Sequence, residues 1–127
     1  MSNSTTLFNI DLNLQLKHSN RVKICFDIIN RFLPQSEIYL FGSYAKRKIK
    51  DESDIDILVV LEDKFTPKEI QELRWKIEDE LYAINNMAFE LDLKLYTKVF
   101  YQEQLAHSYF FMEIEEYKKD LRGVKWN

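Results

Sequence analysis

The chain has 127 residues, and its composition limits the kinds of protein it can be. Apolar residues make up 46% of it, enough to build a buried core and too many for a disordered chain. Eighteen basic and 21 acidic residues leave a net charge of −3, so we expect no extensive nucleic-acid-binding surface. The one cysteine, Cys25, excludes an internal disulfide and a thiolate-rich metal site.

The sequence also contains no signal for a membrane or for secretion. No apolar run approaches the roughly 20 residues that a membrane-spanning helix needs, and the polar start MSNSTT lacks the form of a signal peptide. We therefore expect a soluble cytoplasmic protein. The length and the absence of an internal linker predict a single domain over residues 1–127, with residues 1–18 as an N-terminal extension.

The first patterned segment is an alternation of apolar and polar residues from Phe8 to Leu16. This period of two predicts a half-buried strand, which would be an added sheet edge or an oligomer contact. The intervening Asn and Asp residues are poor strand formers, so a helix that pairs Leu12 with Leu16 is the alternative. A helix should follow, with Ser19 as its N-cap and its end before Pro34.

The central stretch reads as strand, turn, basic loop and strand. Apolar β-formers from Ile38 to Phe41 stop at Gly42, the residue type that allows a tight turn or a close approach to a ligand. Ser43 follows at the expected start of a short helix, where free backbone N–H groups favour phosphate. Ten residues later, Ser53 precedes a second strand that continues to Leu61.

Two carboxylates open that second strand. Asp54 and Asp56 are alternate residues, so they project from the same face, about 6–7 Å apart along the chain. Two ionised carboxylates this close repel each other unless a cation lies between them. Oxygen ligands are those that Mg²⁺ prefers, and Mg²⁺ commonly keeps places for substrate phosphates. The stretch therefore suggests phosphoryl transfer from a nucleoside triphosphate.

The loop between the turn and the carboxylates is basic. Lys46, Arg47, Lys48 and Lys50 place four cations within five residues of an otherwise slightly acidic chain. Such a run is either a solvated loop or a surface that attracts phosphate. Arg47 in particular either reaches a triphosphate oxygen or crowds the turn, and the sequence leaves both open.

The second half of the chain predicts a helix, a strand and a last helix. Thr66, Pro67 and Glu69 form a helix start, and an apolar stripe continues to about Asn85. The strand from Phe89 to Tyr96 carries Asp92 on its polar face, either as a solvated residue or as a third catalytic carboxylate. Ser108 should cap the last helix, whose inner residues would be Phe111, Ile114, Tyr117 and Leu121. The cluster Tyr109-Phe110-Phe111 exceeds one buried helix face, which suggests contact with a partner protein.

Together these elements predict an α/β fold of two layers, with helices packed on one face of a small mixed β-sheet. The site would lie on the opposite sheet face, because Asp54, Asp56 and Asp92 cannot be buried in an apolar core.

The motifs resemble those of the minimal nucleotidyltransferases, within the DNA polymerase β superfamily. GSYAKR, from Gly42 to Arg47, lies over the family pattern GSxARG, and SDIDI, from Ser53 to Ile57, lies over SDIDL. The family's third carboxylate, on a later strand, matches Asp92. The resemblance covers most of residues 20–118 and implies a polymerase β-like nucleotidyltransferase fold. Arg47 departs from the family, which usually has glycine there, and so does Tyr117, which follows Glu116 in place of a glycine.

The resemblance implies a site and a reaction. Asp54, Asp56 and Asp92 would bind two Mg²⁺ ions, and Asp92 would help deprotonate the attacking hydroxyl. The nucleoside triphosphate, most readily ATP, would bind at the residues of the two motifs, Gly42, Ser43, Lys46, Arg47 and Ser53. The implied reaction transfers a nucleoside monophosphate to a hydroxyl and releases pyrophosphate.

The resemblance also implies a partner. Minimal family members are often paired with a helical HEPN-type protein as antitoxin and toxin, and some attach AMP to that partner. The alternative is a binding module, in which the fold serves mainly as a partner-docking or nucleotide-sensing subunit. The three carboxylates favour the enzyme, whereas Arg47 and the missing glycines keep the binding module open.

Overall fold

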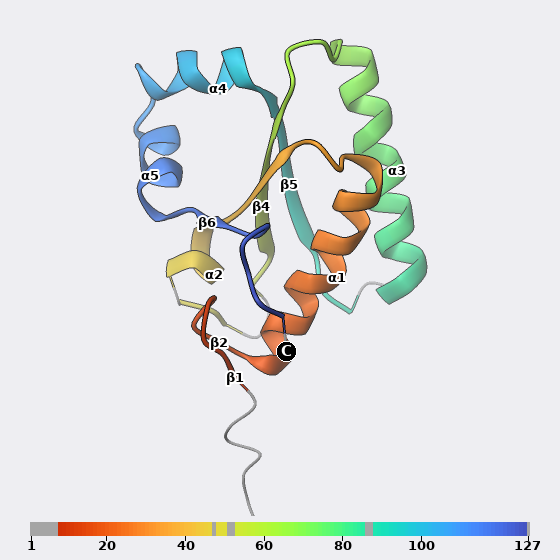
Figure 1. Ribbon diagram of the computed structural model, residues 1–127, viewed down its shortest axis with the longest axis vertical. Coiled ribbons are helices and arrows are strands. Elements are labelled where there is room, and N and C mark those ends of the chain that lie inside the picture. The colour runs from red at the N-terminus through yellow and green to blue at the C-terminus, as the bar shows by residue number, and fades with distance from the viewer. Residues whose placement is uncertain (1–7, 47, 51–52, 86–87, 127) are drawn as a thin grey trace, which may run out of the picture.

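A computed structural model describes residues 8–46, 48–50, 53–85 and 88–126 (Figure 1). In chain order its elements are β1 (Phe8–Asn9), β2 (Leu14–Gln15), α1 (Leu16–Phe32), β3 (Glu37–Phe41), α2 (Gly42–Lys46), β4 (Ile55–Leu61), α3 (Pro67–Asn85), β5 (Leu91–Thr97), α4 (Lys98–Leu105), α5 (Tyr109–Tyr117) and β6 (Lys119–Asp120). Within this described part of the chain, no helix has the length and apolar character to cross a membrane.

The main sheet has four strands in the order β5-β4-β3-β6. β3 pairs antiparallel with β4 and β6, whereas β4 pairs parallel with β5, so the sheet is mixed. The parallel pair requires a crossover, and α3 supplies it. The predicted fold class, an α/β protein with a small mixed sheet, is confirmed.

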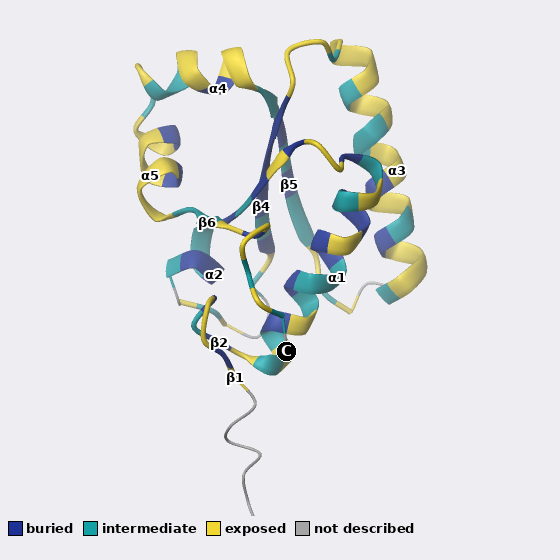
Figure 2. Cartoon of the chain, in the orientation of Figure 1, coloured by how far each residue is buried: buried dark blue, intermediate teal, exposed yellow. Residues whose placement is uncertain are grey.

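Helices cover both faces of this sheet, which differs from the prediction of helices on one face. Alternate residues of β4 separate the two sides: Ile57, Val59 and Leu61 join the main core with α1 and α3, while Leu58 and Val60 join a second core with α4 and α5. β4 is buried along nearly its whole length (Figure 2). Its run of apolar residues, unbroken by polar ones after Asp56, is the sequence feature that requires this double cover.

The predicted starts of α3 and α5 are confirmed by their cap hydrogen bonds. The Thr66 hydroxyl accepts from the Glu69 backbone N–H at 3.2 Å, and the Glu69 carboxylate accepts from the Thr66 N–H at 2.9 Å. The Ser108 hydroxyl accepts from the Phe111 N–H at 3.4 Å. α4 was not predicted, although Thr97 caps it in the same way, accepting from the Phe100 N–H at 3.3 Å.

The predicted N-terminal strand over residues 8–16 is wrong. β1 and β2 are two short strands that pair antiparallel with each other and stay separate from the main sheet. The Asn9 side chain accepts from the Leu12 N–H at 3.1 Å, and Asn13 has a φ of 57°, so two asparagines turn the chain within the predicted strand. α1 then begins at Leu16, which leaves Ser19 inside the helix and buried; it is not the cap.

Cys25 lies in the main core, as predicted. It is 1% exposed, and burial raises the pKa of its thiol to about 12. The thiolate is the reactive form of cysteine, so Cys25 is chemically inert at neutral pH.

The C-terminal segment does not continue the last helix as predicted. α5 ends at Tyr117, and Lys119–Asp120 pairs with β3 as β6, which carries Leu121 into the main core. Arg122 then binds the end of α1: its guanidinium donates to the Ser36 carbonyl at 2.7 Å, the Leu33 carbonyl at 3.0 Å and the Asn30 side chain at 2.7 Å. Carbonyls at a helix end lack helical partners, so this arginine stabilises the C-terminus of α1.

We expect Arg122→Met to lower the free energy of unfolding by about 1–2 kcal/mol, because it removes charge-assisted hydrogen bonds to main-chain carbonyls. The matched control is Arg31→Met, whose exposed side chain makes a single ion pair with Glu80. That control should change stability by no more than about 0.5 kcal/mol. Urea unfolding measures both variants, and equal losses would contradict the role assigned to Arg122.

Candidate active site

Asp56 and Asp92 lie side by side on neighbouring strands. In the parallel β4–β5 pair, Asp56 is directly opposite Asp92, and on the other side of β4 it is opposite Phe41. Both carboxylates belong to the sheet face that α4 and α5 cover, but at the end of the strands where β4 begins. The register of the central strands therefore brings two acids, 36 positions apart in the sequence, into contact range.

Gly42 allows the turn after β3 to pack directly against the Asp56 side chain. Its φ is +68°, a conformation that L side chains rarely adopt, and a Cβ at this position would lie 2.0 Å from the Asp56 Oδ2 atom. No other residue type allows this approach without displacing the carboxylate. The first turn of α2 is consequently held next to the pair of acids.

The carboxylates share a strongly negative environment. Burial is the main cause that raises the pKa of Asp56 to about 7, followed by the charge of Asp92, a hydrogen bond with Asp92 and the charge of Asp54. Lys94, on the same face of β5, opposes the shift, and its ammonium lies 3.4 Å from the Asp92 Oδ1 atom. One lysine does not neutralise this cluster, so the site favours a further cation.

A hollow of about 230 Å³ opens over the carboxylates. Its floor comes from the strands and the turn after β3, and its wall comes from α2 and α5. The strand and turn residues are Phe41, Gly42, Asp56, Asp92 and Lys94; the helix residues are Lys46, Phe110, Glu113, Ile114 and Tyr117.

Among the predicted site residues, Asp56, Asp92, Gly42 and Lys46 line this hollow, whereas Asp54 does not. Asp54 is exposed just before β4, near enough for its charge to affect Asp56. Lys46 lies in the hollow with its ammonium 2.9 Å from the Glu113 carboxylate and 5.3 Å from the centre of the Tyr117 ring.

The other predicted nucleotide-binding residues lie around the turn. Ser43 is half-buried in the first turn of α2. The Ser53 hydroxyl accepts from the Lys50 backbone N–H at 2.8 Å, so in this structure it already has a main-chain partner. Arg47 lies outside the described residues, and its predicted role stays a prediction.

Lys94 and the α5 wall were missed by the sequence analysis. Phe110, Glu113, Ile114 and Tyr117 stand at positions i, i+3, i+4 and i+7, the spacing of one helix face. That spacing was visible in the sequence, but Ile114 and Tyr117 were assigned to the core, Phe110 to a partner contact, and Glu113 was given no role. Lys94 carried a signal as well, because it shares a strand face with Asp92.

The acidic pair fits a divalent cation as a partial ligand set. Across the described residues, no group of three His, Cys, Asp or Glu side chains is assembled as a metal site. Asp56 and Asp92 nevertheless present carboxylate oxygens side by side, repel each other and border a hollow. Mg²⁺ is commonly held by one or two carboxylates together with substrate phosphates and waters, and this pair matches that pattern.

We expect Lys94→Met to tighten the binding of Mn²⁺ in the absence of nucleotide and to lower the thermal midpoint of the metal-free protein slightly. Removing the cation beside Asp92 increases the attraction for a metal and leaves the carboxylate repulsion less compensated. Paramagnetic resonance of free Mn²⁺ measures the first effect. Lys98→Met, an exposed lysine on α4, is the control, and equal Mn²⁺ affinity in all three proteins would contradict this role of Lys94.

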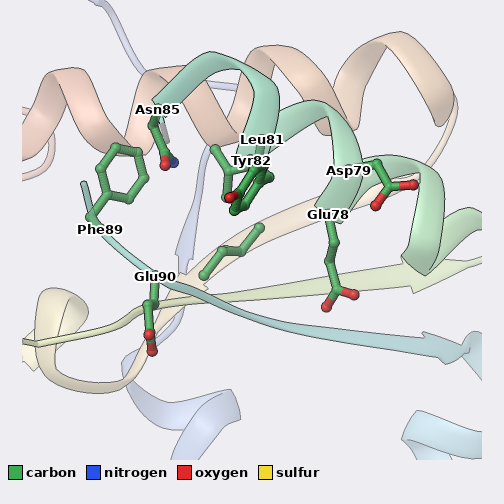
Figure 3. Close-up of a pocket in the computed structure, with 8 residues that line it drawn as sticks. Glu78, Asp79, Leu81, Tyr82, Asn85, Phe89 and Glu90 are labelled. Atoms are coloured by element: carbon green, nitrogen blue, oxygen red, sulfur yellow. The ribbon is translucent and has the colours of Figure 1, made fainter. Parts of the chain in front are cut away.

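A second hollow, of about 360 Å³, lies between α3 and the start of β5 (Figure 3). Glu78, Asp79, Tyr82 and Phe89 are among its lining residues, and no predicted site residue belongs to it. Its buried Asn85 Nδ2 atom has no hydrogen-bond partner among the described residues. It is distinct from the hollow over Asp56.

The fold and the paired acids agree with a family comparison. The family model described as "Polymerase beta, Nucleotidyltransferase" matches residues 23–114, which is most of the chain. The protein therefore belongs to the polymerase β nucleotidyltransferase family, and the predicted resemblance and enzyme class, a nucleotidyltransferase, are confirmed.

Solved structures with a similar fold include three that cover most of the chain. A toxin–antitoxin structure with AMP-PNP is 23% identical, covers 84% of this chain and 74% of its own, and has a TM-score of 0.52. A mutant of the toxin–antitoxin MntA-HpeT is 22% identical, with 83% and 74% covered and a TM-score of 0.50. A candidate nucleotidyltransferase from Sulfolobus solfataricus is 15% identical, with 98% and 94% covered and a TM-score of 0.54. A search of curated protein sequences finds no match.

Proposed function

We propose that this protein transfers a nucleoside monophosphate, most readily AMP, from a nucleoside triphosphate to a hydroxyl acceptor in a Mg²⁺-dependent reaction. The observation that carries the proposal is the pair of acids Asp56 and Asp92, directly opposite each other beside the Gly42 turn. Phosphoryl transfer depends mainly on positioning and charge stabilisation, and in this proposal the two acids with bound metal ions would supply both.

In this proposal the carboxylates hold metal ions and receive a proton. Asp56 and Asp92, joined by Asp54, would hold two Mg²⁺ ions, which when bound stabilise the attacking and leaving oxygens of an in-line displacement. Asp92 accepts the proton of the acceptor hydroxyl. The acceptor oxygen then bonds to the α-phosphorus, the bond from that phosphorus to the bridging oxygen breaks, and pyrophosphate leaves with the bonding electrons.

The turn and the neighbouring side chains orient the triphosphate. Gly42 lets the turn pack against Asp56, and the Ser43 hydroxyl and N–H group, in the first turn of α2, are proposed phosphate ligands. Lys46 would exchange Glu113 for a phosphate oxygen, because that ion pair is partly exposed and worth little on its own. Arg47 and Ser53 complete the proposed nucleotide-binding set.

We further propose that a helical protein partner, of the HEPN type, supplies the acceptor hydroxyl, so that the chain acts as an antitoxin. The solved toxin–antitoxin structures with this fold support a two-protein system. Large apolar residues are exposed on α4 and α5, which cover the sheet face that carries the acids, among them Val99, Phe100, Tyr109 and Met112. These residues give a partner an apolar surface to cover.

A partner-binding or nucleotide-sensing subunit without transferase activity is the second candidate. The observation that favours it is the Lys46–Glu113 ion pair, which in this structure occupies a lysine proposed to bind nucleotide. In a family member without transferase activity, Lys46 would stay paired with Glu113 and would not bind a nucleotide.

The two candidates are separated by following the α-phosphate. The protein is incubated with Mg²⁺, a co-purified partner and each nucleoside triphosphate labelled on its α-phosphorus. The proposed transferase leaves label covalently attached to an acceptor and releases pyrophosphate, with ATP the best donor. Tight nucleotide binding without label transfer or pyrophosphate release would support the sensing subunit and overturn the transferase.

A further inference from the structure

A groove of about 540 Å³ lies next to the carboxylate hollow, between α2 and the segment from α5 to β6. Its lining residues are Ala45, Lys46, Lys48, Glu113, Glu116, Tyr117, Lys118 and Lys119. Lys46, Glu113 and Tyr117 line both spaces, so the groove continues the hollow over Asp56 and Asp92. The two helices and β6 that enclose it lie together at one side of the sheet (Figure 1).

The groove is positively charged in an acidic protein. Four lysines and two glutamates line it, a surplus of two positive charges in a chain whose net charge is −3. The lysines come from the end of α2, the loop after it and the segment after α5, so the fold gathers charges that lie far apart in the sequence.

The four lysines differ in what they contact. Lys46 is paired with Glu113, and Lys118 is paired with Glu115 at 2.7 Å and lies over the Tyr39 and Tyr101 rings at 4.1 and 5.4 Å. Lys48 and Lys119 have no ion-pair partner among the described residues. With these two pairs set aside, Lys48 and Lys119 remain against Glu116, so these two lysines are the ones that the described residues leave to attract an anion.

We propose that this groove binds a chain of phosphate groups that extends out of the carboxylate hollow past Lys46. A compact ammonium on a flexible stem suits phosphate, which it binds as a point charge. Glu113 and Glu116, on the same side of the groove as Lys118 and Lys119, repel an anion, so the groove suits a short anion that contacts the lysines and avoids these two carboxylates. The phosphates belong either to the donor triphosphate or to a phosphate-bearing acceptor; this choice rests on the proposed function, whereas the charge of the groove does not.

The test uses inorganic tripolyphosphate without divalent metal, so that the carboxylate site does not contribute. Calorimetric titration in EDTA should show binding to the wild type that weakens as salt rises. The double variant Lys48→Ser, Lys119→Ser should bind roughly tenfold more weakly or worse, the loss expected for hydrogen bonds to charged groups. Lys48→Ser alone, at a position outside the helices and strands, should show part of this loss if the double variant is poorly folded.

The control removes the same charge elsewhere. Lys68→Ser, Lys76→Ser changes two exposed lysines of α3, which packs on the opposite face of the sheet. It should leave tripolyphosphate binding within about twofold of the wild type. An equal loss in the control, or no loss in the Lys48 and Lys119 variants, would overturn the groove. Loss of Mg-ATP binding in Asp56→Asn is measured separately, so failure of the groove leaves the proposed function standing, and the reverse also holds.

Competition then identifies the source of the phosphates. If the groove holds the donor triphosphate, tripolyphosphate competes with Mg-ATP, and the double variant weakens Mg-ATP binding while sparing Mg-AMP. If the groove holds acceptor phosphates, tripolyphosphate binds alongside Mg-ATP, and the double variant leaves Mg-ATP affinity unchanged. If Asp56→Asn weakens tripolyphosphate binding and the lysine changes do not, both assignments are overturned.

Discussion

Replacing Asp56 with asparagine should abolish Mg-ATP binding while making the protein more stable at neutral pH. Asp56 is half-buried between Asp92 and the Gly42 turn, so its ionised form is unfavourable in the absence of a cation. Asparagine keeps the shape and removes the charge. After allowance for solvent screening at a half-exposed group, we expect about 1–2 kcal/mol of added stability.

Ionisation of Asp56 should make the free energy of unfolding depend on pH. The pKa of Asp56 is raised from 3.8 to about 7, so the folded protein retains a proton that the unfolded chain releases. The wild type should therefore lose stability as the pH rises from about 4 to about 7 and level off above it. The charged groups facing Asp56 are Asp92, Asp54 and Lys94 on the strands, with Lys46 and Glu113 from α2 and α5.

Urea unfolding across this pH range, with and without Asp56→Asn, measures the contribution. The variant should lack the decline that the wild type shows. Asp79→Asn, an exposed acid on α3, is the control and should keep both the decline and Mg-ATP binding. A variant less stable than the wild type at pH 7, or one with unchanged Mg-ATP affinity, would contradict the repulsive carboxylate site.

Gly42→Ala should destabilise the protein by about 2–4 kcal/mol and remove nucleotide binding. A left-handed backbone costs an alanine about 1–2 kcal/mol, and the new Cβ would lie 2.0 Å from the Asp56 Oδ2 atom and 2.8 Å from its Cγ atom. Either the turn or the carboxylate must move, and each movement separates α2 from the acids. Thermal melts and Mg-ATP titration measure the two effects.

Gly123→Ala is the matched control, because a Cβ there meets nothing within 4 Å. It should change stability by no more than about 0.5 kcal/mol. In an Asp56→Ala background the clash with the carboxylate disappears, so Gly42→Ala should cost less there than in the wild type. Equal costs in both backgrounds would show that the backbone alone, and not the contact with Asp56, requires glycine.

The features predicted well from the sequence are those that local chemistry decides. Thr66 with Glu69, and Ser108, carry cap signals that act within one helix turn, and both helices begin where predicted. β4 was predicted from its run of apolar residues after Asp54, and it begins at Ile55. The mixed α/β sheet followed from the order of these elements.

The features that sequence analysis missed depend on contacts between distant segments. β6 exists because β3 has a free edge to pair with, and its two residues carry no strand signal of their own. Asn9 and Asn13 turned an apparent strand into a hairpin, although their poor strand propensity gave warning. α4 began at a threonine cap that was not recognised.

The candidate site shows the same division. Gly42, Asp56 and Asp92 were predicted as site residues, and the structure brings all three together. The α5 wall was not predicted, because which face of α5 meets the carboxylates depends on how it packs over β4. The Lys46–Glu113 ion pair was likewise invisible in the sequence, since its members are 67 positions apart.

The central claim, that Asp56 and Asp92 form a metal-dependent nucleotide site, is tested most directly in crystals soaked with Mn²⁺ and a non-hydrolysable ATP analogue. We expect an anomalous peak within coordination distance of both carboxylates, next to triphosphate density at the Gly42 turn. Nucleotide density without an anomalous peak at Asp56, for example in the hollow beside Tyr82 and Phe89, would contradict the claim.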